Sequence, residues 1–250
     1  MSRQNDQTQN MARAAIIIAA IRSGGTFLSH CLSNHPQVFC DRGEPLHHDS
    51  VWVNNLRPNR RHLLAAVTNQ TGYHVSMCKL TYAQAFHPHI WPWLEKRQPL
   101  VVWLRRENLI RQAVSVLINK QARRGGVKRA QHTFREARPV QVELAPEQVL
   151  AKARELRSHD GQARARLARM SKMLAVTYAE VTGGEMATSA ERLPEETAAR
   201  LCAFLGVRPE VLGCDLQRVN PFPLRELLSN WPAVRAAVRK SEFTGMLGDG

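Results

Sequence analysis

The sequence predicts a single α/β domain with a central parallel sheet flanked by helices. Short apolar runs alternate with stretches of helical periodicity, and this alternation is typical of that class. Three runs are apolar almost throughout, as expected for strands that are covered on both faces: residues 14–20, 73–80 and 100–104. The length of 250 residues also fits one large domain, since a domain typically has ~100–200 residues.

The remaining elements are bounded by residues that start or stop helices. Pro36 ends the helix that follows the first strand, and Gly125 ends the helix after the strand at 100–104. Pro146 opens a long third helix, and Gly206 closes a fourth. The predicted helices span residues 26–34, 109–123, 146–170, 193–205 and 223–240, and a further strand spans residues 173–178.

The two least regular segments are the N-terminus and a basic stretch in the middle of the chain. Residues 1–12 are polar and without periodicity, so we expect a disordered tail before a domain over residues 13–250. Residues about 123–142 are expected to form a basic, mobile insertion in that domain.

Cysteine content and hydropathy exclude several classes of protein. The 5 cysteines are odd in number and contain no CxxC pair, which argues against a disulfide framework and a structural zinc site. No apolar run approaches the ~20 residues of a membrane span, and the N-terminus lacks the basic region of a signal peptide. We therefore expect a cytoplasmic protein without a membrane span, and leave a homodimer open.

The charge distribution points to an anionic ligand. The net charge is +14, and residues 105–138 alone hold ten basic and two acidic residues. Such a local positive field concentrates anions by electrostatic steering. Nucleic acid is one possible anion, so the charge by itself does not identify the ligand.

The segment between the first strand and the first helix has the residues of an anion-binding loop. It reads Arg22-Ser23-Gly24-Gly25-Thr26, at the point where an open parallel sheet binds ligands. Backbone N–H groups and the helix dipole favour an anion there, and the arginine can add a forked positive charge. An ordinary turn with Thr26 as the N-cap residue is the structural alternative. A kinase-type P-loop is disfavoured, because the lysine of GxxxxGK[ST] is missing.

A second group of polar residues follows the strand at 100–104. Arg106 lies just past the end of this strand, and Ser115 lies on the helix that follows. Together they could hold a further phosphate at the same sheet edge. Separately, a surface arginine and a helix serine bonded to its own turn would be the simpler explanation.

These residues resemble the sulfotransferases that use 3′-phosphoadenosine 5′-phosphosulfate (PAPS). Residues 22–27, which end in Phe27, resemble the family's 5′-phosphosulfate loop, and residues 104–115 resemble its 3′-phosphate motif. The Arg-Gln-Ala-Val-Ser sequence at 111–115 is similar to the bacterial carbohydrate branch that includes trehalose sulfotransferase. Further similarities lie at residues 35–36, 43–45, 176–180, 204–207 and 227–231.

The resemblance implies a P-loop-like three-layer fold, PAPS as sulfuryl donor, no metal, and a carbohydrate or other hydroxyl acceptor. Arg22 and the loop Ser23, Gly24, Gly25, Thr26 and Phe27 would hold the 5′-phosphosulfate. Arg106 and Ser115 would hold the 3′-phosphate, with help from Arg111, and Arg105 could share or replace the role of Arg106.

The resemblance also implies the groups that act on the acceptor. Glu44 matches the carboxylate proposed as the base in the bacterial branch, and His48 is a local rival because an imidazole pKa near ~6.5 suits a base. Lys79 would stabilise the bridging oxygen. Thr81 stands where the cytosolic branch has its histidine base, which favours Glu44.

Two positions depart from the family pattern. Gly25 stands where Thr or Ser is usual, and the interval from Arg106 to Ser115 is nine residues, one longer than in the cytosolic branch.

A nucleotide kinase and a non-catalytic nucleic-acid-binding protein remain the alternative functions, although nucleic acid is the less expected partner.

Overall fold

The computed structural model describes residues 12–41, 67, 72–124, 141–185, 191–216 and 222–247. Residues 1–11 of the predicted tail and residues 125–140 of the predicted basic insertion lie outside this part of the chain.

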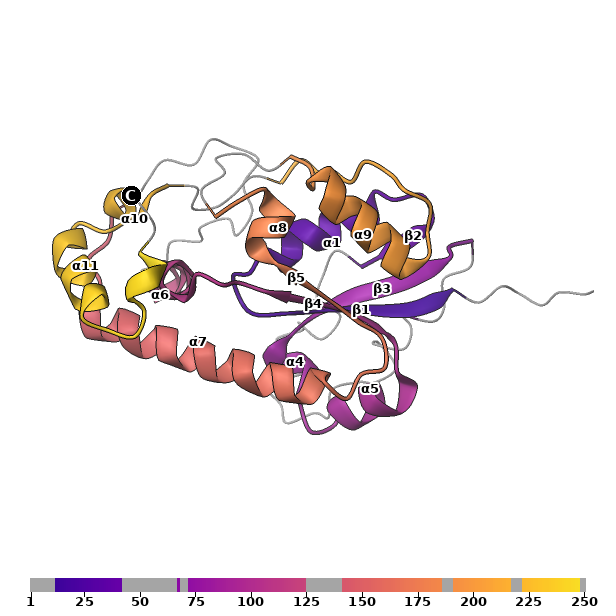
Figure 1. The fold of residues 1–250 in the computed structure, drawn as a ribbon, viewed down its shortest axis with the longest axis horizontal. Helices are drawn as coiled ribbons and strands as arrows, with labels where there is room; N and C mark the ends of the chain where they lie inside the picture. The colour runs from indigo at the N-terminus through magenta and orange to yellow at the C-terminus, as the bar shows by residue number, and fades with distance from the viewer. Residues whose placement is uncertain are drawn as a thin grey trace, which may run out of the picture.

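A five-stranded parallel sheet forms the centre of the described structure (Figure 1). Its strands are β1 (Arg13–Ala19), β2 (Val38–Cys40), β3 (Val75–Thr81), β4 (Leu100–Arg105) and β5 (Met173–Thr177). They lie in the order β2-β3-β1-β4-β5, so β1 is central, with Ile17 opposite Lys79 on one side and Val102 on the other. Because all pairs are parallel, the carboxyl ends of the strands share one edge.

Helices cover both faces of the sheet, which confirms the predicted fold class. One face holds α1 (Gly25–Ser33), α8 (Tyr178–Thr182) and α9 (Glu195–Leu205), and the other holds α4 (Tyr82–Ala85), α5 (Trp91–Arg97) and the end of α7 (Pro146–Leu167) (Figure 1). Alternate residues of β1 enter two different cores, since side chains alternate along a strand. Ile17 packs with α1 and α9, whereas Ile16 and Ile18 pack with α5 and α7.

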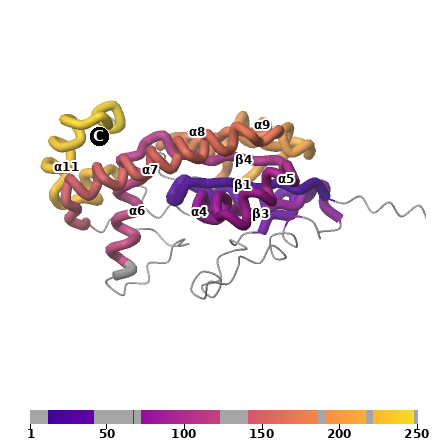
Figure 2. The backbone as a smooth tube through the Cα atoms, turned by 90° about the horizontal axis from the view of Figure 1, so that it is seen from below, coloured from indigo at the N-terminus to yellow at the C-terminus, as the bar shows by residue number. Residues whose placement is uncertain are grey.

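A third apolar cluster lies beyond the carboxyl edge of the sheet. It joins α6 (Leu109–Arg124) to the first half of α7 and to α10 (Leu224–Leu227) and α11 (Trp231–Arg239), and the 3-10 helix η1 (Thr244–Met246) follows. Figure 2 shows α7 running from this helical end of the molecule toward the strands. The long helix α7 therefore holds the helical end and the sheet in one structure.

The prediction of one continuous helix over residues 223–240 is wrong. The chain leaves the helical conformation at Leu228, whose φ and ψ are −116° and 117°. There its backbone pairs with Val142: the N–H of Val142 donates to Leu227 at 2.9 Å, and the N–H of Ser229 donates to Val142 at 3.0 Å. A backbone pairing with a distant segment thus divides the helix.

A candidate anion-binding site at the carboxyl edge of the sheet

The loop after β1 is held in a conformation that most residues avoid. Arg22 has a φ of 59°, and Gly24, the N-cap residue of α1, has a φ of 87°. A non-glycine residue in this region is strained, and such strain clusters at functional sites. A Cβ atom on Gly24 would also lie 3.1 Å from the ring of Tyr178. Glycine is therefore needed at position 24 for both its backbone freedom and its small size.

The start of α1 is packed against a buried lysine. Lys79, on β3, is 7% exposed, and its Nζ donates a hydrogen bond to Oγ1 of Thr26 at 2.9 Å. A Cβ atom on Gly25 would lie 2.9 Å from Cδ of Lys79 and 3.1 Å from Cβ of Ala19. The lysine stem thus fills the space that a larger residue at position 25 would need. This contact accounts for glycine at position 25.

The remaining residues of the loop and of the start of α1 contact the protein itself. The alternative in which Thr26 is the N-cap residue is wrong, because Gly24 takes that position. Both donors of Ser23 turn back to the carbonyl of Ala20, with Oγ at 2.6 Å and N at 3.3 Å. Phe27 is half-buried against the core beneath α1 and α9. The first turn of α1 directs its backbone N–H groups toward the sheet edge, as at the start of any helix.

Hydrogen bonds connect the loop after β1 with Arg106, just past β4, and with α6, and so join the two predicted phosphate motifs. Nε of Arg22 donates to Oγ of Ser115 at 3.0 Å, and Nη1 of Arg106 donates to the carbonyl oxygen of Arg22 at 3.3 Å. The buried amide of Gln112 adds a bond from Nε2 to the carbonyl oxygen of Ile21 at 2.6 Å. The structure therefore brings Arg22, Arg106 and Ser115 together at one place.

Arg106 contacts an aromatic ring and two carboxylate oxygens at this edge. Its guanidinium is 4.0 Å from the centre of the Tyr178 ring, within the range of a cation–π contact. It also binds the Glu185 carboxylate through two nitrogen atoms, with Nε 3.0 Å from Oε1 and Nη2 2.6 Å from Oε2. Oε2 of the same carboxylate is 3.8 Å from Nε of Arg111. Two nearly buried guanidinium groups thus converge on one carboxylate.

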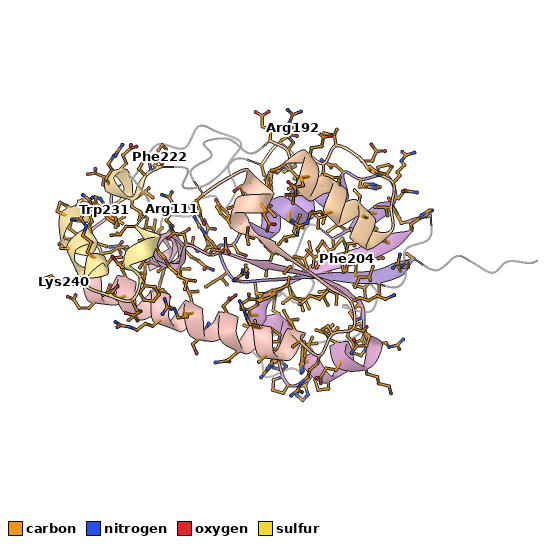
Figure 3. The ribbon with its side chains drawn as sticks, viewed as in Figure 1. Arg111, Arg192, Phe204, Phe222, Trp231 and Lys240 are labelled. Atoms are coloured by element: carbon orange, nitrogen blue, oxygen red, sulfur yellow. The ribbon has the colours of Figure 1, made fainter. Side chains whose placement is uncertain are left out.

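Arg105 and Arg111 differ in whether they lie near the Glu185 carboxylate. Arg111, on α6 and labelled in Figure 3, donates from Nη2 to the carbonyl oxygen of Phe222 at 2.9 Å. Arg105 instead pairs with Glu107 at 3.2 Å and lies 5.6 Å from the centre of the Trp103 ring. The structure therefore places Arg106 and Arg111, and not Arg105, around the bound carboxylate.

Two predicted catalytic residues, Glu44 and His48, lie outside the described residues. Of the other predicted site residues, Lys79 reaches the loop through Thr26.

Across the described ranges, no group of three or more His, Cys, Asp or Glu side chains could hold a metal ion. Within the same ranges, no helix is both long enough and apolar enough to span a membrane.

Three residues of the site have no role assigned from the sequence, although Gln112 and Tyr178 lie in segments that resemble the sulfotransferase family. Tyr178 follows β5, so its place at the shared sheet edge could have been inferred in the same way as that of Arg106. Gln112 could have been found by its helical spacing, one turn before Ser115 on α6. Glu185 follows a short helix, and no local pattern indicates its contact with Arg106.

Neither a known family model nor a curated protein matches the chain. Its structure resembles a sulfotransferase domain. That solved structure is the "Sulfotransferase Domain from the Curacin Biosynthetic Pathway", which is 14% identical, with a TM-score of 0.45, over 80% of this chain and 75% of the other.

The arrangement offers cationic groups at two neighbouring positions. The first position lies at the start of α1, with Arg22 and Lys79 beside the helix N-terminus. The second lies around Arg106 and Arg111, where a carboxylate is bound. The bond between Arg22 and Ser115 connects them.

Proposed function

We propose that this protein is a PAPS-dependent sulfotransferase, which moves a sulfuryl group from PAPS to a hydroxyl group and releases 3′-phosphoadenosine 5′-phosphate (PAP). The proposal rests mainly on one observation, the hydrogen bond from Arg106 to the backbone of Arg22. This bond puts the two cation-rich motifs side by side, as a nucleotide with both 5′ and 3′ anionic groups requires. The sequence resemblance of both motifs supports the same conclusion.

The loop and α1 would hold the 5′-phosphosulfate. In the transfer, the acceptor oxygen forms a bond to sulfur, the bond from sulfur to the bridging oxygen breaks, and its electron pair stays on the phosphate. Arg22, Lys79 and the N–H groups of α1 offset the charge that develops there, because fixed cations and dipoles act strongly where water is excluded. The bond from Lys79 to Thr26 holds the ammonium group at the helix start.

The second position would hold the 3′-phosphate and distinguish PAPS from ATP. Arg106 supplies a planar fork of donors, which suits two phosphate oxygens. Arg111 adds a second cation, and Ser115 adds a hydroxyl that already contacts Arg22. ADP and ATP have no 3′-phosphate, so they would leave this position unused.

Glu44 is proposed as the base that removes the acceptor proton, with His48 as the rival. We infer a carbohydrate acceptor from the resemblance to the trehalose-type branch. The variants Glu44→Ala and His48→Ala test the assignment by single-turnover sulfation and by PAP titration. Loss of turnover with unchanged PAP affinity in only one variant identifies the base, since a base acts on the acceptor and not on the nucleotide. Full turnover in both variants would remove both residues from this role.

Calorimetric titration with PAP, ADP and magnesium–ATP tests the donor assignment. We expect PAP to bind at least ~10-fold more tightly than ADP, because a charge-assisted phosphate contact contributes about 1.5–3 kcal/mol. The titrations are repeated at low and moderate salt. Equal and weak binding of all three ligands that fades with salt would contradict the proposal and indicate a general polyanion surface.

A further inference from the structure

We infer that Glu185 is a built-in competitor for the second anion position, and that a phosphate group binds there only by displacing this carboxylate. The inference extends the proposed function and rests on it for the identity of the phosphate, which would be the 3′-phosphate of the nucleotide. The contact itself is independent of that identity. It concerns how tightly the ligand is held and how easily it leaves.

The geometry of the contact is that of an anion bound by two arginines. Glu185 offers both carboxylate oxygens to Arg106, at 3.0 and 2.6 Å, and one of them lies 3.8 Å from Arg111. A phosphate presents pairs of oxygens to a guanidinium fork in the same way. The carboxylate therefore occupies the donors that would bind phosphate.

Burial explains why the position needs an anion when no ligand is bound. The side chains of Arg106 and Arg111 are 7% and 9% exposed, and that of Glu185 is 21% exposed. Buried charges without a partner are strongly destabilising. Glu185 supplies the partner from the partly exposed side, where an entering ligand can replace it.

The backbone before Glu185 allows this replacement without a change in α8. Gly183 and Gly184 have φ values of 73° and 130°, a region that favours glycine. The N–H of Gly184 donates to the carbonyl of Ala179 at 2.8 Å, and the hydroxyl of Thr182 donates to the carbonyl of Gly184 at 2.9 Å. These bonds fix the turn, so rotation of the Glu185 side chain is enough to free Arg106.

Competition by Glu185 lowers the affinity of the site for the phosphate ligand and makes release of that ligand easier. When a site must open before it binds, the apparent dissociation constant rises by the inverse of the open fraction. Glu185 lowers the affinity for a ligand that uses Arg106, and it does not change the affinity for a ligand without a 3′-phosphate. By returning to Arg106, it also takes the place of a departing 3′-phosphate.

Titration with inorganic phosphate tests the competition without assuming a nucleotide. The variants are Glu185→Gln, which removes the charge, and Glu185→Asp, which keeps the charge and shortens the side chain. The matched control is Glu180→Gln on α8, because Glu180 pairs with Arg200 at 2.6 Å and glutamine keeps its capping role. Melting curves confirm that each variant is folded.

We expect Glu185→Gln to bind phosphate about tenfold more tightly than the wild-type protein, which corresponds to an open fraction of about a tenth. Glu185→Asp should show most of this gain, because its shorter side chain keeps the charge but should no longer occupy the donors of Arg106. The double variant Glu185→Gln/Arg106→Ala should show no gain, and Glu180→Gln should match the wild type.

The outcomes separate this inference from the proposed function. If neither Glu185 variant binds phosphate more tightly, the competition is overturned, whatever the nucleotide preference. If only Glu185→Gln gains, a general charge effect replaces the competition. If phosphate binding improves as expected but PAP binds no better than ADP, the competition stands and the donor assignment fails.

Discussion

Nε of Arg22 donates a hydrogen bond to Oγ of Ser115, 3.0 Å away, across 93 residues of sequence. The bond crosses from the loop after β1 to the middle of α6 and connects the two positions where anions would bind. It forms with Arg22 in the left-handed region, at a φ of 59°. The loop therefore holds a strained backbone conformation in which its arginine faces the second motif.

The two adjacent arginines after β4 provide a matched test of the 3′-phosphate position. Arg106→Ala should weaken PAP binding by about 10- to 100-fold, since a hydrogen bond to a charged group contributes about 1.5–3 kcal/mol. ADP binding should change little. Arg105→Ala is the control, because Arg105 pairs with Glu107 and not with the loop. Calorimetry measures all four affinities, and equal losses of PAP and ADP would remove Arg106 from this role.

Lys79 should affect the transfer step more than binding. Lys79→Met keeps the apolar stem against Gly25 and removes the ammonium group. We expect kcat to fall by about 100-fold or more, as for the loss of one group that stabilises transition-state charge, with a much smaller change in PAP affinity. Thr26→Val is the control that removes only the partner hydroxyl. A kcat equal to that of the wild type in Lys79→Met would contradict the assignment.

Gly25 and Gly161 allow the same substitution in a crowded and an open place. Gly25→Ala would put a Cβ atom 2.9 Å from Lys79 and 3.1 Å from Ala19, whereas a Cβ atom on Gly161 meets nothing within 4 Å. We expect Gly25→Ala to lower the free energy of unfolding by about 1–3 kcal/mol through overpacking. Gly161→Ala, within α7, should raise it by about 0.5–1 kcal/mol. Chemical denaturation measures both, and similar effects of the two would argue against the crowding.

Glu180 should contribute stability that depends on pH. Burial alone would raise the pKa of its carboxyl, but hydrogen bonds from Arg200 and Thr177 outweigh burial and lower the pKa below its usual value. The folded-state pKa is thus below the unfolded one, so the stabilisation is present above pH ~4.3 and is lost as the pH falls through the folded-state pKa.

The Glu180→Gln variant isolates this contribution. The difference in the free energy of unfolding between wild type and variant should be largest at neutral pH and shrink between pH 5 and 3. It should stay below ~1 kcal/mol, because the pair is partly exposed and screened by solvent. Denaturation at several pH values measures the difference. A difference that is constant over this range would show that the carboxylate pairing has no role in it.

The main strands could be predicted because their burial leaves a mark in the sequence. β1, β3 and β4 are covered on both faces, so they are apolar runs. β2 has three residues, too few to show a pattern. The break between α10 and α11 depends on Val142, and a pairing with a distant backbone leaves no mark in the local periodicity.

The residues of the site likewise include some that the sequence predicts and some that it does not. Arg22 and Arg106 each follow a strand, and the shared edge of a parallel sheet brings such residues together. That rule does not extend to Glu185, which reaches Arg106 through a turn after α8. Nor does it predict that Lys79 fills the space beside Gly25, because that contact depends on side-chain packing between neighbouring strands.

The strand order has a consequence for the time at which binding ability arises during synthesis. β1 emerges first from the ribosome, but its two partners, β3 and β4, come much later in the chain. Contacts between distant residues form slowly, because a long loop must be closed before they are gained. The two anion positions also need Ser115 and Tyr178, so they are completed only after Tyr178 has been made. The two proposed anion positions therefore form only together with the tertiary structure, once β3 and β4 have paired with β1.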